Sequence, residues 1–165
     1  NPAGGPWGYG ANENFAGNNR RAGLEIESGI QAGRLALSGS YTYTDSEVLD
    51  GIYAGSAIPG VPTHTFSTRG TFLCGDAATL TLEGVYTGAR HFESDWGNAF
   101  PRQDDYFLLN SRLQYRVGKS LLHLDLKNLL NQEYSQYGVL GGYPNQRAYY
   151  PSPKFHVMAG LTFGF

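Results

Sequence analysis

The sequence has little charge, a single cysteine and no long hydrophobic run. Charged residues make up 16% of the chain, and its 12 lysines and arginines are scattered, which argues against a nucleic-acid partner. The lone Cys74 cannot form an internal disulfide and has no cysteine or histidine at metal-binding spacing. No stretch approaches about 18 consecutive apolar residues, which excludes a transmembrane helix but not a membrane β-barrel, whose apolar residues alternate with polar ones.

Glycine and aromatic residues are abundant instead. The 165 residues include 23 glycines, 12 tyrosines and 9 phenylalanines, a composition typical of strands and turns and not of amphipathic helices. The first residues, Asn-Pro-Ala-Gly-Gly-Pro-Trp, lack the charged and apolar regions of a signal peptide, and we expect the chain to be a fragment of a longer protein. The predicted fold class is all-β.

Seven segments alternate apolar and polar residues with a period of two. Leu122, Leu124 and Leu126, for example, are separated by His123 and Asp125, which is the pattern of a strand with one apolar and one polar face. The seven predicted strands lie at about residues 20–30, 34–44, 64–74, 79–92, 105–117, 120–130 and 154–165. Arg90 breaks the alternation near the end of the fourth segment.

The connections between these segments alternate in length. Short ones lie at 31–33, 75–78 and 118–119, and long ones at about 45–63, 93–104 and 131–153. This regularity is typical of an outer-membrane barrel, in which strands of roughly 9–11 residues are joined by short periplasmic turns and longer external loops. The pattern predicts an antiparallel up-and-down meander of about seven long strands.

An odd number of strands implies that this meander is incomplete. A seven-stranded open sheet would leave two unpaired edges in lipid, which is costly, so we expect the chain to be part of a larger barrel. The alternative is a soluble β-sandwich binding domain, but it would need two sheets sharing one core, and long strands with unbroken polar faces argue against it.

The orientation follows from the short turns. If the C-terminus lies in the periplasm, all three short turns fall on the periplasmic side. Tyr41, Tyr43, Phe92, Tyr106 and Phe107 are then expected near the outer interface, where aromatic residues form a girdle.

Several motifs resemble those of TonB-dependent outer-membrane receptors, in the same order and at similar spacing. Residues 128–134 resemble the element "N-L-F-D/N-x-x-Y" that ends the penultimate strand, with Leu130 where the family often has Phe and Asn131 where it often has Asp. Residues 21–25 resemble the strand start "R-x-G-x-E", residues 41–45 the strand end "Y-T-Y-T-D/N", and residues 59–64 the segment "P-x-x-P-x-H". Residues 160–165 resemble the strand that closes the barrel.

This resemblance, to receptors of the siderophore or iron-chelate type, implies a fold and a function. The chain would form the C-terminal portion of a roughly 22-stranded transmembrane β-barrel plugged by an N-terminal domain, with residues 1–18 ending an external loop and residues 19–165 forming the last seven strands. Such receptors bind and import ferric siderophores or related nutrient chelates, using energy from the TonB complex, which would act through the missing N-terminal region. The fragment alone would not transport. A non-transporting outer-membrane barrel, such as an adhesin or porin, is the alternative.

The same resemblance assigns structural roles to two groups of residues. The terminal Phe163 and Phe165 resemble the signal read by the outer-membrane insertion machinery. The strand-ending element would act through polar side chains that bond the backbone where the strand stops and through one interfacial tyrosine: Asn128, Leu129, Leu130, Asn131 and Tyr134.

Residues that bind a ligand are expected in the external loops. Aromatic faces and guanidinium groups suit a planar or anionic chelate, through stacking and paired hydrogen bonds. The candidates are Trp7, Tyr9, Trp96, Arg102, Tyr137, Tyr143, Arg147, Tyr149 and Tyr150. Interfacial tyrosines are also common in barrels that bind nothing.

An enzyme, a cofactor and a bound metal are not expected. His123 and Asp125 share a strand face, but the sequence places no nucleophilic serine beside them. The four histidines fall on different predicted strands without paired spacing, which argues against a metal site: His64, His91, His123 and His156.

Overall fold

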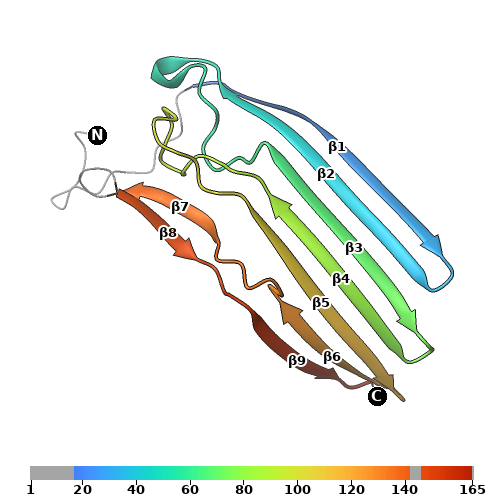
Figure 1. Ribbon diagram of the computed structural model, residues 1–165. Helices are drawn as coiled ribbons and strands as arrows, with labels where there is room; N and C mark the ends of the chain where they lie inside the picture. The colour runs from blue at the N-terminus through green and yellow to red at the C-terminus, as the bar shows by residue number, and fades with distance from the viewer. Residues whose placement is uncertain (1–16, 142–145, 165) are drawn as a thin grey trace.

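The computed structural model describes residues 17–141 and 146–164, and it contains one antiparallel sheet and one separate hairpin (Figure 1). The strands are β1 (Asn19–Ala32), β2 (Leu35–Val48), β3 (His64–Cys74), β4 (Ala78–Thr87), β5 (Tyr106–Val117), β6 (Ser120–Lys127), β7 (Ser135–Gly141), β8 (Gln146–Pro151) and β9 (His156–Thr162), with one 3-10 turn, η1 (Gly51–Tyr53). In these residues no helix is long and apolar enough to cross a membrane.

The sheet confirms the predicted meander. Its strand order is β1-β2-β3-β4-β5-β6-β9, so each strand pairs with the next one along the chain, except that the β7–β8 hairpin leaves the sheet between β6 and β9. This hairpin lies inside the long connection predicted at 131–153 and was not predicted. The fourth and sixth strands end earlier than predicted, at Thr87 and Lys127, and the second continues further, to Val48.

One face of the sheet is a continuous apolar band. The strand register aligns Ile26, Tyr41, Phe66, Tyr86 and Phe107 in a single row across the first five strands. The same alternation continues to the last strand, and many of these side chains are exposed, Ile26 at 52% for example. Successive side chains of a strand point to opposite faces, so a register shift of one residue would move every apolar side chain of that strand to the polar face. The continuous apolar band therefore fixes the register.

The opposite face is polar and carries ion pairs between neighbouring strands. Arg69 on β3 donates to Glu83 on β4 at 2.8 Å, and Arg112 on β5 forms two hydrogen bonds with Asp125 on β6, at 2.5 and 2.8 Å. Asp125 is only 1% exposed, although it lies on this face. The sheet is therefore apolar on one side and charged on the other, as in a barrel wall between lipid and a polar lumen.

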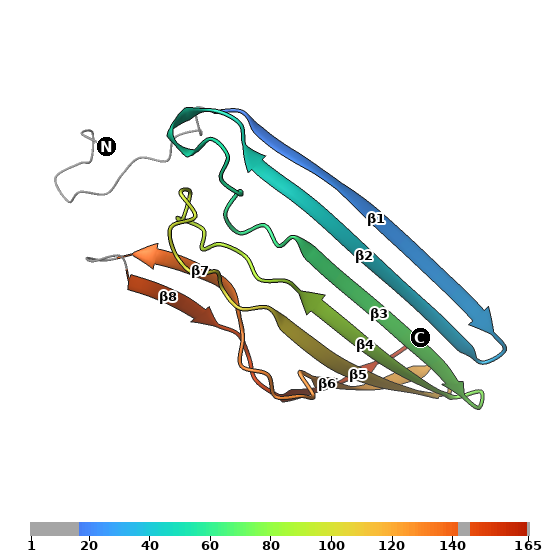
Figure 2. The same cartoon turned by 45° about the horizontal axis from the view of Figure 1, so that its top comes forward.

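Short and long connections lie at opposite ends of the sheet (Figures 1 and 2). The three short turns each contain a glycine with a positive φ: Gly33 at 57°, Gly75 at 73° and Gly118 at 58°. Glycine adopts this left-handed backbone without strain, which lets two strands reverse within a few residues. The three long connections, 49–63, 88–105 and 128–155, gather at the other end.

Gly23 on β1 lies against the backbone of β2, and replacing it is expected to disturb this pairing. A Cβ atom at position 23 would lie 2.1 Å from the backbone oxygen of Tyr43. Because backbone must then move, we expect Gly23→Ala to lower the free energy of unfolding by about 1–3 kcal/mol in urea unfolding of the protein in detergent. Gly29→Ala is the matched control in the same strand, since its Cβ would meet nothing closer than 3.5 Å. Equal effects of the two substitutions would contradict the expectation.

Candidate functional site

Asn128 ends β6 and holds together the two ends of the long connection that follows. Its φ is 51°, it is 2% exposed, and its side chain bonds both to Gln132, where the connection leaves the sheet, and to Pro153, where it returns. The amide group donates to both backbone oxygens, at 2.9 and 3.3 Å, and its oxygen accepts from the Gln132 backbone N–H at 2.9 Å. The backbone N–H of Asn128 donates to Asn110 on β5.

The rest of the strand-ending element completes this junction. Asn131 also has a positive φ, 50°, and its side-chain oxygen accepts from the backbone N–H of Phe155 at 3.1 Å. Tyr134 packs on Tyr106 of β5, with ring centroids 4.8 Å apart. Leu129 bonds to the backbone of β5, whereas Leu130 is 55% exposed. These contacts support a structural role for the element.

The β7–β8 hairpin is bonded to the connection between β4 and β5. Ser94 both donates to the backbone oxygen of Leu140 and accepts from its N–H, each at 2.9 Å. The backbone N–H of Glu93 donates to Gly138 at 3.1 Å. These bonds join segments that lie more than 40 residues apart in the sequence, so the hairpin and this loop are held as one unit.

A buried polar pair, Arg90 and Gln103, lies between this loop and the hairpin. Their backbones form an isolated antiparallel bridge, and the two residues are 5% and 3% exposed. The Arg90 guanidinium donates to the backbone oxygens of Ser135 and Gln136, at 2.9 and 2.8 Å, and lies 5.5 Å from the centre of the Tyr106 ring. The arginine that interrupts the strand pattern thus anchors the hairpin.

Phe92 lies in this loop and not on the apolar face of the sheet. The prediction that it belongs to the outer aromatic girdle is wrong, because β4 ends at Thr87 and the chain then turns toward the hairpin. Phe92 is completely buried and packs edge-on against Tyr149 of β8, with ring centroids 5.4 Å apart. It serves as the core of the loop region.

The connection between β2 and β3 is joined to the same unit. The side chain of Asn98 accepts from the backbone N–H of Ala57 at 2.6 Å and donates to its backbone oxygen at 3.0 Å. The backbone N–H of Gly60 donates to His91 at 3.0 Å. All three long connections therefore form one hydrogen-bonded layer, which we call the loop layer: the described residues of 49–63, 88–105 and 128–155.

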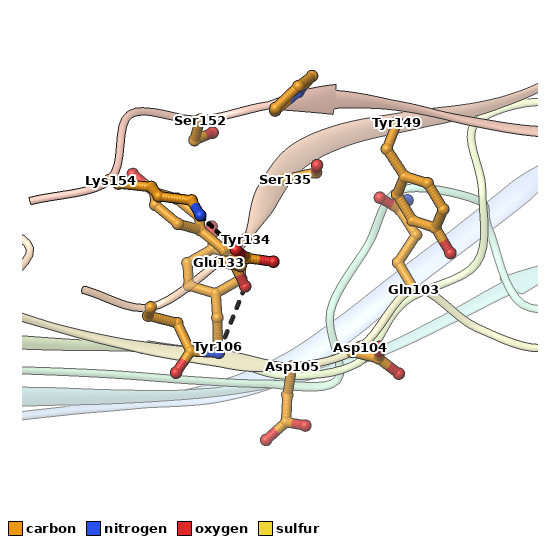
Figure 3. Close-up of a pocket in the computed structure, with 12 residues that line it drawn as sticks. Gln103, Asp104, Asp105, Tyr106, Glu133, Tyr134, Ser135, Tyr149, Ser152 and Lys154 are labelled. Atoms are coloured by element: carbon orange, nitrogen blue, oxygen red, sulfur yellow. Dashed lines mark hydrogen bonds and ion pairs between the residues drawn. The ribbon is translucent and has the colours of Figure 1, made fainter. Parts of the chain in front are cut away.

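A cleft of about 380 Å³ opens in the loop layer where β5 begins and the hairpin joins the sheet (Figure 3). Its lining residues are Gln103, Asp104, Asp105, Tyr106, Gln132, Glu133, Tyr134, Ser135, Tyr149, Pro151, Ser152 and Lys154. Figure 3 shows Lys154 directed toward Glu133, with which it forms an ion pair. A hydrogen bond from the Lys154 ammonium group, reinforced by its charge, lowers the pKa of the Glu133 carboxyl. The cleft combines tyrosine rings with three carboxylates and one ammonium group.

The predicted ligand residues that the structure describes lie in the loop layer but do not all meet. Arg102 and Trp96 lie in the loop between β4 and β5, and the Arg102 Nε–H donates to His91 at 3.3 Å. Tyr137 and Tyr150 pack edge to face on the hairpin, 5.3 Å apart, and Arg147 lies on the same hairpin. Among the predicted ligand residues that the structure describes, Tyr149 lines the cleft. Trp7, Tyr9, Tyr143 and Phe165 lie outside the described residues.

The sequence analysis did not identify the cleft residues that come from the connection between β4 and β5. Gln103, Asp104 and Asp105 form no recognisable motif, and what brings them to the hairpin is the bridge between Arg90 and Gln103. The interruption of the alternating pattern at Arg90 was the signal available in the sequence.

No metal-binding cluster of three or more histidine, cysteine or acidic residues occurs among the residues that the structure describes. His123 lies 3.9 Å from Asp125, but both oxygens of that carboxylate are bonded to Arg112. The His123 ring also packs over Gly160 of β9, where an added Cβ atom would lie 2.3 Å from the ring. This arrangement supports strand packing and not proton transfer.

Comparisons with solved structures agree with the fold. The ferric yersiniabactin uptake receptor FyuA from Yersinia pestis matches 88% of this chain and 23% of its own, with 22% identity and a TM-score of 0.74. The ferric-catecholate import receptor Fiu from E. coli K12, in its closed form, matches 88% of this chain and 21% of its own, with 22% identity and a TM-score of 0.68. The copper transporter OprC matches 90% of this chain and 24% of its own, with 16% identity and a TM-score of 0.73.

The chain therefore spans less than a quarter of the length of these proteins. No match was found among curated proteins. The profile of a family described as "TonB dependent receptor-like, beta-barrel" matches residues 1–131. With this match over most of its length, and with a sheet that has the two faces of a barrel wall, the chain belongs to the TonB-dependent receptor-like β-barrel family.

Proposed function

We propose that this chain is the C-terminal sector of an outer-membrane receptor that binds and imports ferric siderophores or a related nutrient chelate. The observation that carries this proposal is the open sheet with its two contrasting faces. β1 and β9 each have one unpaired edge in the described structure, and an apolar band runs across the strands between them. Since unpaired strand edges are costly in lipid, the sheet needs further strands to close.

The receptor's partners follow from this assignment. Lipid would cover the apolar band, and the outer-membrane insertion machinery would read the C-terminal strand through Phe163 and Phe165. The C-terminus would lie in the periplasm, which puts the loop layer outside the cell. The TonB complex would act through an N-terminal region that precedes this chain.

The loop layer suits a chelate as cargo. Two of its features can hold such a ligand: tyrosine rings, on which planar groups stack, and the exposed guanidinium groups of Arg102 and Arg147, which can pair with anionic oxygens. Similar solved structures are described as importing ferric chelates or copper, which supports transport and not catalysis. An iron chelate is the cargo that we propose.

Uptake by native cells tests this function. A strain lacking the gene that encodes this chain is expected to lose uptake of at least one radioactive ferric chelate, and dissipating the proton gradient of the wild type should abolish the same uptake. An antibody against residues 131–153 should detect a band several times larger than this chain in the outer membrane, rising under iron starvation. Unchanged uptake of every chelate would favour an adhesin or porin, and a band of this size in the soluble fraction would favour a sandwich domain.

A further inference from the structure

His91 lies at the centre of the loop layer and contacts a residue proposed to bind cargo. It follows the bridging residue Arg90 and is 9% exposed. Its backbone oxygen accepts from the N–H of Gly60 in the first connection and from the side chain of Gln103. The backbone of His91 is therefore fixed from two sides, and its ring can act as a support for a neighbouring side chain.

The hydrogen bonds of the ring determine which nitrogen carries the proton. Arg102 donates from Nε to His91 Nε2 at 3.3 Å, and a guanidinium group has only donors and stays charged at any physiological pH. Nε2 must therefore accept and carry no proton. The proton of the neutral ring then lies on Nδ1, which donates to Asp95 at 3.4 Å.

Asp95 is itself held rigidly. It is 3% exposed, and its carboxylate accepts from the backbone N–H groups of Ala99 at 2.8 Å and Phe100 at 3.2 Å. A carboxylate that orients one ring nitrogen fixes the direction of the other, as in histidines that act on a third group. Asp95, His91 and Arg102 thus form a chain of contacts that ends in an exposed residue, Arg102.

We infer that His91 is a positioning residue, which as the Nδ1–H tautomer holds the Arg102 guanidinium ready for an anionic group of the cargo. This inference rests on the proposed function insofar as Arg102 meets cargo. Without an acceptor at position 91, Arg102 would lose the contact that fixes its direction.

The charged groups nearest the ring belong to its own loop. Asp95 and Arg102 face the ring, the Arg90 guanidinium is directed to the hairpin backbone, and Glu93 lies beside Gly60. The contact from the first connection is a backbone N–H. Asp95 therefore holds the ring from one side, and Arg102 rests on it from the other.

Crystal structures of the whole receptor without cargo test the positioning itself. In the wild type, Arg102 should rest on His91 Nε2, and in His91→Ala it should leave this position. In His91→Gln, whose side-chain oxygen can accept from Arg102, the guanidinium should return to the same place. An Arg102 that keeps its place in His91→Ala would overturn the inference.

Binding measurements test the consequence for cargo. With a panel of ferric chelates that includes ferric citrate and a ferric hydroxamate, His91→Ala should bind about fivefold more weakly than wild type, and His91→Gln should recover most of the affinity. His64→Ala is the matched control, because His64 bonds to Tyr41 on the sheet, and it should keep the wild-type affinity. Equal affinities of wild type and His91→Ala would remove the role in binding. If no chelate of the panel binds the wild type, the cargo assignment fails, and the crystal structures still decide the positioning.

Discussion

Replacing Asn128 with alanine is expected to lower the free energy of unfolding of the protein by about 2–4 kcal/mol. The substitution removes three hydrogen bonds that join Gln132 and Pro153, and it leaves their backbone groups without this partner. It also puts a residue with little tolerance for positive φ at 51°. Denaturant unfolding in detergent measures the loss, and hydrogen exchange should rise at the amides of Gln132 and Leu129.

Two further substitutions separate the contributions of backbone and side chain. Asn128→Gly tolerates the positive φ but lacks the side chain, so it should lose less stability than Asn128→Ala. Asn128→Asp keeps the acceptor for Gln132 and loses the donors to the two backbone oxygens, so it should also fall between wild type and alanine. A loss in Asn128→Ala below about 0.5 kcal/mol would mean that the junction is held by other contacts.

Replacing Arg112 with methionine is expected to cost more free energy of unfolding than Arg69→Met, because it leaves the Asp125 carboxylate, which its neighbours cover, without its partner. Asp125 is 1% exposed, whereas about half of the Arg112 side chain is exposed. The reverse substitution, Asp125→Asn, should cost less, since water can solvate the guanidinium that remains. Urea unfolding of both variants in detergent measures this asymmetry.

The neighbouring pair on the polar face provides the matched control. Arg69 bonds to Glu83 at 2.8 Å, but both side chains are substantially exposed, so Arg69→Met should cost less than about 1 kcal/mol. Combining Arg112→Met with Asp125→Leu should recover part of the lost stability, because the buried charge is then gone. If the two arginine substitutions cost the same, burial of Asp125 does not govern the pair.

The sheet could be predicted from the sequence because each strand carries its own signal. The alternation that includes Leu122, Leu124 and Leu126 fixes which face is apolar, and the glycines of the short turns mark where the chain reverses. The end of β6 was less clear, since two further leucines, Leu129 and Leu130, follow the strand. The positive φ of Asn128 ends the strand, and a backbone angle of this kind leaves no trace in an alternating pattern.

The loop layer could not be predicted in the same way. Its structure depends on contacts between distant residues, such as Ser94 with Leu140 and Asn98 with Ala57, and such pairs have no local period. The candidate ligand residues were chosen by side-chain type, which placed them in the right region but could not show that Arg102 contacts His91. The strands β7 and β8 were missed because each is short and their sequences alternate poorly.

The way in which the loop layer is held has a consequence for how this surface can evolve. Several of the hydrogen bonds that hold the loop layer together have a main-chain group as acceptor. Examples are the bonds from Glu93 to Gly138 and from Gly60 to His91, and the two bonds from the Arg90 guanidinium to carbonyl oxygens of the hairpin. Main-chain partners are present whatever side chain a position carries. Most exposed positions of the layer are therefore free to change, while the few anchoring side chains keep the layer in shape.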